Sequence, residues 1–174
     1  SNLNSQGRIQ CGQTKFTTDI PTTGLAVTTD TRVSRGSQFY RVAETYTPNG
    51  KEICGRDIAL IRLQNGIPSK VATPLDPRLS GPVKGGESYT AIGYGLDGTK
   101  RGSSGVRRII KDRTVRCTGN GCRSYYIQDS EFVGSGWACQ GYSGGSAIGS
   151  KGEVLGVASR ADRNRSFPLY TGVY

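Results

Sequence analysis

The sequence predicts an all-β protein built from many short strands. It contains 26 glycines, and its apolar runs are short and rich in valine, threonine and serine. Turn-forming pairs separate these runs, namely Asn49-Gly50, Asn65-Gly66, Asp97-Gly98 and Asn120-Gly121. No long amphipathic helix is visible between the turns. Short strands joined by tight turns, as in a sandwich or a barrel, are therefore expected along the chain.

Eight segments are predicted to be strands, because each is short, apolar and bounded by turn residues. In chain order they are Gly24–Thr28, Gln38–Ala43, Ile58–Leu63, Tyr89–Gly93, Arg107–Ile110, Ser146–Ile148, Val154–Ser159 and Leu169–Val173. Between the third and the fourth lies the proline-containing passage Ile67–Val83, which shows no strong periodicity. We expect this passage to link two halves, residues 1–78 and 79–174.

The composition limits the class of protein. Apolar residues make up 34% of the chain, which is low but enough for a core if polar and apolar positions interleave. No run approaches the ~18 apolar residues of a membrane-spanning helix, so no membrane span is expected. The chain contains no methionine. We expect it to be a mature or excised piece of a longer protein that carried any targeting peptide upstream.

A formal net charge of +10 raises the question of an anionic partner. Basic residues cluster at positions 100–116, but there they alternate with apolar residues in the manner of a solvated strand face. No helix-turn-helix, zinc-finger or aromatic RNA-binding motif accompanies them, so no nucleic acid is expected. A basic extracellular surface drawn to anionic glycans or cell walls is the simpler interpretation.

The five cysteines favour disulfides over a metal site. The chain has no histidine and no C-x-x-C pair with which to build a zinc site, and no cofactor is predicted. Cys117 and Cys122 bracket the turn-forming insert Thr-Gly-Asn-Gly and are expected to pair. Cys11 and Cys54 would then close a long loop. Cys139 is left either with a partner outside this sequence or as a free thiol.

A serine enclosed by glycines is the strongest indication of chemistry. It lies in the segment Cys139-Gln140-Gly141-Tyr142-Ser143-Gly144-Gly145-Ser146. The glycine before the serine permits a tight turn and leaves an N–H free to point at a reacting carbonyl oxygen. A serine nucleophile also needs a base, usually histidine, and a carboxylate that orients the base. Because the chain contains no histidine, Ser143 would depend on a base from outside these residues, or has none.

A candidate carboxylate precedes an apolar strand. Asp57 stands directly before Ile58-Ala59-Leu60-Ile61, where it would be partly buried and would need a donor. An aspartate ahead of a strand is more often a cap or a surface ion pair. Ser159, on the strand that follows the serine loop, is one candidate donor to Asp57.

Taken together, these segments resemble the trypsin-like serine peptidases of the chymotrypsin fold, and most closely the secreted trypsin-like proteins of bacteria. The similar motifs are Asp57-Ile58-Ala59-Leu60, Gly93-Tyr94-Gly95, Gly141-Tyr142-Ser143-Gly144-Gly145, Gly156-Val157-Ala158-Ser159 and Tyr170-Thr171-Gly172-Val173. The resemblance implies two antiparallel six-stranded barrels, the first of them incomplete in this chain. It also implies that the catalytic histidine lies in a segment upstream of residue 1 and that a C-terminal helix follows residue 174.

The resemblance further implies the roles of individual residues. Ser143 would be the nucleophile, Asp57 the orienting carboxylate, and the N–H groups of Gly141 and Ser143 the oxyanion hole. The substrate pocket would be formed by Trp137, Ala138, Gln140 and Ser159. Trp137 falls at the floor of that pocket, where its indole could fill the space. Tyr142 stands where the family has an acidic residue that pairs with the new N-terminal ammonium after zymogen cleavage, and a tyrosine cannot form that ion pair.

Three functions are therefore weighed. The first is a secreted serine endopeptidase that acts on polypeptides, for which these 174 residues alone are expected to be inactive. The second is a catalytically inactive relative that binds proteins or anionic glycans through its basic surface. The third is an unrelated β-rich binding domain, which would require two ordered motifs to coincide by chance.

Overall fold

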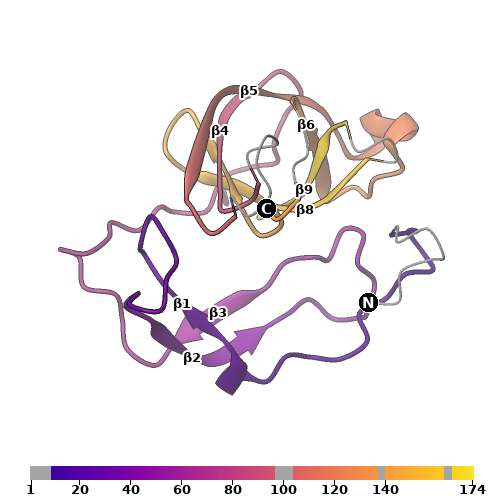
Figure 1. The fold of residues 1–174 in the computed structure, drawn as a ribbon. Helices are drawn as coiled ribbons and strands as arrows, with labels where there is room; N and C mark the ends of the chain where they lie inside the picture. The colour runs from indigo at the N-terminus through magenta and orange to yellow at the C-terminus, as the bar shows by residue number, and fades with distance from the viewer. Residues whose placement is uncertain (1–8, 97–103, 137–139, 163–165) are drawn as a thin grey trace.

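The computed structural model describes residues 9–96, 104–136, 140–162 and 166–174. Its strands form a three-stranded sheet and a closed six-stranded barrel. Figure 1 shows the barrel above the sheet, with a long strand-free connection between them. The only helices among the described residues are two short 3-10 helices, η1 (Thr22–Gly24) and η2 (Gly119–Tyr125). The all-β prediction is confirmed.

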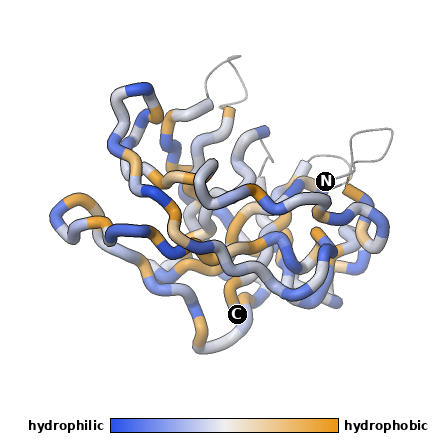
Figure 2. Tube along the Cα trace, turned by 90° about the horizontal axis from the view of Figure 1, so that it is seen from below, coloured by the Kyte–Doolittle hydropathy of each residue, from blue (hydrophilic) through white to orange (hydrophobic). Residues whose placement is uncertain are grey.

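The first half of the chain forms an open antiparallel sheet. Its strands are β1 (Ala26–Val27), β2 (Tyr40–Tyr46) and β3 (Leu60–Leu63), with β2 in the centre. Apolar side chains of β3 remain exposed, 71% for Leu60 and 47% for Ile61. Figure 2 views the molecule from the side of this half and shows apolar and polar segments alternating along its chain. The described residues cover these side chains only in part, and the sheet stays open with three strands.

The second half of the chain closes into a barrel of six antiparallel strands. The strands are β4 (Ser88–Gly93), β5 (Arg108–Thr118), β6 (Glu131–Gly134), β7 (Ser146–Gly149), β8 (Val154–Ala161) and β9 (Pro168–Gly172). They follow one another around the barrel in the order β4-β5-β6-β9-β8-β7. The strands that follow the serine loop form a hairpin, because β7 pairs with β8 across the turn at residues 150–153.

Aromatic side chains fill the barrel core. The rings of Phe132 and Tyr170 stack with centroids 4.9 Å apart, and Tyr89 meets Tyr170 edge to face at 5.5 Å. Leu155 is completely buried beside them. Burial raises the pKa of Tyr89 and of Tyr170, because a phenolate is poorly solvated there.

The eight predicted strands are all present, and the bounds of seven of them differ by at most three residues. The fifth, predicted at Arg107–Ile110, continues to Thr118 as β5, and β6 was not predicted. Strand β6 is buried at all four residues, including Glu131, so it has neither polar alternation nor a fully apolar run. Strand β5 continues to Thr118 through Lys111-Asp112-Arg113, a charged stretch that disguises a strand.

Covalent and ionic links hold the connections in place. Both predicted disulfides are confirmed, Cys11–Cys54 and Cys117–Cys122, whereas Cys139 lies outside the described residues. In the connection between the halves, Arg78 forms ion pairs with Glu87 and Glu153, both at 2.6 Å. These pairs anchor the connection to the barrel. The division at residues 78 and 79 remains a prediction.

Candidate active site

The loop that carries Ser143 is fastened to strand β8 by backbone hydrogen bonds. The Gly144 N–H donates to the Ala158 carbonyl at 2.7 Å, and the Ala158 N–H donates to the Gly145 carbonyl at 2.8 Å. Within the loop, the Gly145 N–H donates to the Tyr142 carbonyl at 2.8 Å. Ser143 itself is exposed. The loop therefore presents its hydroxyl to solvent from a backbone held at two points.

Ser159 connects Ser143 with Asp57. The Ser159 hydroxyl donates to the Asp57 carboxylate at 2.6 Å, and the Ser143 hydroxyl donates to the Ser159 carbonyl at 3.4 Å. Because both bonds end on one residue, its covalent geometry limits the separation of the Asp57 and Ser143 oxygens to about 11 Å. Ser159 is 7% exposed, whereas Asp57 is half-buried. Residues 86 positions apart in sequence are thus brought to one place at the junction of the halves.

Two backbone N–H groups of the serine loop donate no hydrogen bond to any of the described residues. Gly141 has a φ of 86°, a conformation that favours glycine. Within the described part of the chain, neither the Gly141 N–H nor the Ser143 N–H donates a hydrogen bond to another residue. Two unengaged donors in a tight turn beside a serine hydroxyl are what an oxyanion hole requires.

Tyr142 is packed between two glycines, Gly93 at the end of β4 and Gly95 just after it. A Cβ added at Gly93 would lie 2.6 Å from Cδ1 of the Tyr142 ring, and one at Gly95 would lie 2.2 Å from Cδ2. The ring therefore lies between these two backbone positions, in space that only glycines leave open. Its proximity also helps to raise the pKa of Tyr170 in the barrel core, after the larger effect of burial. The Tyr142 side chain thus points toward Gly93 and Gly95, and its packing there anchors the serine loop.

Two of the four predicted pocket residues, Gln140 and Ser159, lie in the described part of the structure. Gln140 is exposed, and its carbonyl accepts the Leu96 N–H at 2.9 Å, which ties the start of the serine loop to the end of the Gly93–Gly95 segment. Trp137 and Ala138 lie outside the described residues, so the floor of the pocket remains a prediction. Ser159 lies beside Ser143, as described above.

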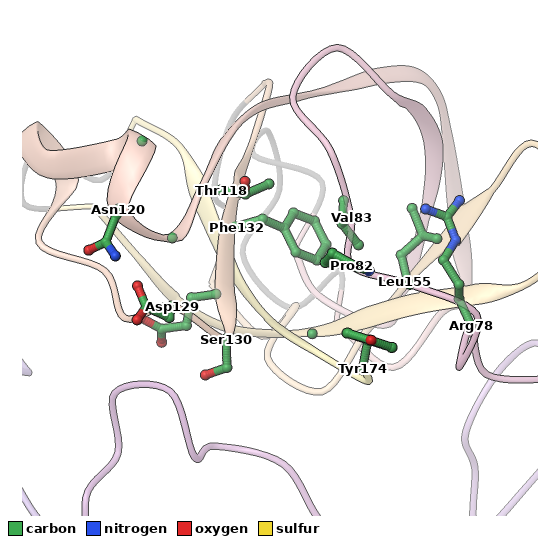
Figure 3. A pocket seen from close by; sticks show the side chains of 15 residues that line it. Arg78, Pro82, Val83, Thr118, Asn120, Asp129, Ser130, Phe132, Leu155 and Tyr174 are labelled. Carbon is green, nitrogen blue, oxygen red and sulfur yellow. The ribbon is translucent and has the colours of Figure 1, made fainter.

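A separate hollow lies elsewhere on the barrel, with a volume of about 600 Å³. Figure 3 shows it between Phe132, Val83 and Leu155, with Tyr174 at its edge and Asp129 and Ser130 toward the first half. None of Ser143, Asp57 and Ser159 lines it.

Among the described residues, no three histidine, cysteine or acidic side chains are grouped as a metal site would require. In the same residues, no helix has the length and apolar character needed to cross a membrane.

The sequence did not reveal two contacts in the neighbourhood of these residues. One is the pair of Gly93 and Gly95 around the Tyr142 ring. The only sequence signal for it was the motif Gly93-Tyr94-Gly95. The other is a buried ion pair between Glu131 and Arg160. Its signal was an acidic residue inside the otherwise apolar segment Glu131-Phe132-Val133.

Comparisons with known proteins agree with this architecture. A solved structure described as neuropsin, a serine protease expressed in the limbic system of mouse brain, superimposes with a TM-score of 0.63. It is 21% identical, and the alignment covers 79% of this chain and 68% of that chain. At that identity the likeness concerns the fold. Comparison with curated protein sequences gave no match. The family model described as Trypsin matches residues 10–174, and the chain therefore belongs to the trypsin family.

Proposed function

We propose that this chain forms the greater part of a serine endopeptidase in which Ser143 is the nucleophile. The observation that carries the proposal is the convergence of Ser143 and Asp57 on Ser159. Family membership supports a polypeptide substrate. The proposal also draws on the unengaged N–H groups of Gly141 and Ser143, which would bind the oxyanion.

The reaction would follow acyl transfer through a covalent intermediate. The Ser143 oxygen attacks the carbonyl carbon of the peptide bond, and its proton passes to the base and then to the departing amine. Water, deprotonated by the same base, hydrolyses the resulting ester. Asp57 would orient the base, and the Ser159 hydroxyl would hold Asp57.

The base would be a histidine supplied from outside these 174 residues, which contain none. An imidazole that hydrogen-bonds at both ends, at ~2.6–3.2 Å, spans about 8 Å, which fits within the limit set by Ser159. We place the protein outside the cell, in line with the two disulfides among the described residues, and propose that its nearest functional relatives are secreted bacterial proteins.

Chemical rescue tests these roles on the 174-residue chain. Added imidazole should increase the formation of an acyl-enzyme from an activated ester, measured by mass spectrometry of the Ser143 peptide. The increase should vanish in Ser143→Ala and fall in Asp57→Asn. Ser150→Ala, which changes an exposed serine in the next turn, is the matched control and should behave as wild type. Equal acylation of the Ser143→Ala protein would refute the assignment.

A second candidate is an inactive relative that binds anionic surfaces or glycans. It is favoured by exposed basic residues, Arg107 directly before β5 and Lys111 and Arg116 within it. Binding to heparin that weakens with salt and is lost on neutralising these three residues would support it. Under this alternative, Ser143 would be only a turn residue and no acylation would occur.

A further inference from the structure

A buried carboxylate in β6 accepts four hydrogen bonds. Glu131 is 1% exposed, and its Oε1 accepts the Gly55 N–H at 2.9 Å while Oε2 accepts the Gln128 N–H at 2.8 Å. The Arg160 guanidinium completes the set, with Nη1 bonded to Oε1 and Nη2 to Oε2 at 2.9 Å. The Arg160 side chain is itself only 8% exposed. Each oxygen of this carboxylate therefore accepts two hydrogen bonds.

The same carboxylate joins the two halves of the chain close to the candidate active site. Gly55 belongs to the first half and stands two residues before Asp57. Arg160 belongs to the barrel and directly follows Ser159, the residue that donates to Asp57. Glu131 thus holds the chain on both sides of the bond between Ser159 and Asp57.

The turn at Gly55 is fitted closely to the barrel. Gly55 has a φ of 77°, and a Cβ there would lie 2.8 Å from the Gln128 Cβ and 2.9 Å from the Ser130 hydroxyl. That hydroxyl donates to the Gly55 carbonyl at 2.8 Å, and Figure 3 shows the Ser130 side chain pointing from the barrel toward the first half. Both polar groups of the Gly55 backbone are therefore bonded to adjacent residues of the barrel, Ser130 and Glu131.

Stability alone does not account for this arrangement. A buried ion pair is costly to desolvate, and apolar residues of similar volume often replace one without loss of stability. What such residues cannot supply is an acceptor for the Gly55 N–H. The ion pair of Glu131 and Arg160 therefore has a specific structural effect, which is to place the turn that leads into Asp57.

We infer that Glu131 and Arg160 are positioning residues, which clamp the turn at Gly55 and thereby hold the Asp57 carboxylate against Ser159. The effect on catalysis rests on the proposed function, whereas the effect on the turn does not.

Hydrogen exchange in the 174-residue chain tests the clamp. In Glu131→Met/Arg160→Met, which retains side-chain volume, the Gly55 amide should exchange roughly 10- to 100-fold faster, as expected on loss of a bond to a charged acceptor. The matched control is Arg78→Met/Glu153→Met, which removes another poorly exposed ion pair, with side chains 16% and 15% exposed. It should leave the Gly55 amide unchanged.

A milder variant guards against loss of the fold. Ser130→Ala removes only the bond to the Gly55 carbonyl, and a rise in exchange of roughly 5-fold at the turn is expected. If the Gly55 amide exchanges as in wild type in both the double variant and Ser130→Ala, the clamp is refuted.

The catalytic consequence is measured in a form of the protein that contains its base. Glu131→Met/Arg160→Met should lower kcat roughly 10- to 100-fold with little change in KM, because misplaced groups slow chemistry rather than binding. Glu131→Gln, which keeps an acceptor for Gly55, should recover part of this loss. Faster exchange with an unchanged kcat would show a purely structural clamp and overturn the positioning role. Absence of activity in the wild-type protein would instead refute the proposed function and leave the exchange result standing.

Discussion

Gly93→Ala tests whether the Tyr142 ring packs against the backbone at Gly93 and so helps to hold the serine loop to the barrel. The added methyl would lie 2.6 Å from Cδ1 and 3.1 Å from Cε1 of the ring, whereas ordinary contacts begin near 3.4 Å. The ring must therefore move by nearly 1 Å, and overpacking of this kind costs about 1–3 kcal/mol. All three of the nearest atoms belong to the Tyr142 side chain, so the clash has a single source.

The double variant Gly93→Ala/Tyr142→Ala shows whether the ring causes the destabilisation by Gly93→Ala. Tyr142→Ala alone should cost about 2 kcal/mol, less than the ~3–5 kcal/mol of a fully buried aromatic, because the side chain is half-buried. Once the ring is absent, the Gly93→Ala methyl has no clash left. The double variant should therefore be as stable as Tyr142→Ala, with a favourable coupling of about 1–3 kcal/mol.

Gly95→Ala is the matched control for this cycle. Its methyl would meet the Tyr142 ring but also two backbone atoms, the Tyr142 nitrogen at 2.7 Å and the Gln140 oxygen at 2.8 Å. Removing the ring should therefore not rescue it. Urea denaturation of the five variants and wild type, with constant m-values, gives the free energies of unfolding. Additive effects of Gly93→Ala and Tyr142→Ala would refute the packing argument.

Three further predictions follow from the contacts. Replacing the Cys11–Cys54 disulfide by serines should cost about 4 kcal/mol and replacing Cys117–Cys122 about 2, because their sequence separations are 43 and 5 residues; equal costs in urea denaturation would contradict this. Burial raises the pKa of Tyr89 and of Tyr170 in the folded state, so their contribution to stability should be constant from pH 8 to ~10 and fall above it; unfolding free energies from pH 8 to 11 that stay flat would exclude this. Ser159→Ala, which removes a 2.6 Å bond to a carboxylate, should destabilise the chain by about 1.5–3 kcal/mol, and a thermal midpoint equal to wild type would show that the bond contributes nothing.

The fold class could be predicted, and Ser143 could be named as a candidate, because both depend on local signals. Asn-Gly pairs mark turns, and a serine between glycines marks an exposed tight turn whatever surrounds it. The Cys117–Cys122 pair was likewise predictable, since the turn residues between them bring the two sulfurs together.

What the sequence could not show depends on contacts between distant segments. Glu131 accepts from Gly55, 76 positions away, and from Arg160, 29 positions away, so its burial has no local signature. The same reason explains why β6 was missed, because a strand buried on both faces around an ion pair has no alternation to detect. The position of Tyr142 was also hidden, since its effect depends on the absence of side chains at Gly93 and Gly95.

The proposed function requires Ser143 to be the nucleophile. The most direct measurement is labelling of a histidine-containing form of the protein with a peptidyl phosphonate, followed by mass spectrometry to locate the adduct. We predict a single adduct on the Ser143 oxygen, slowed about 10⁴-fold in Asp57→Asn, and little adduct on the 174-residue chain, which lacks a histidine. An adduct on another residue, or a histidine-containing form that remains unlabelled while correctly folded, would contradict the account.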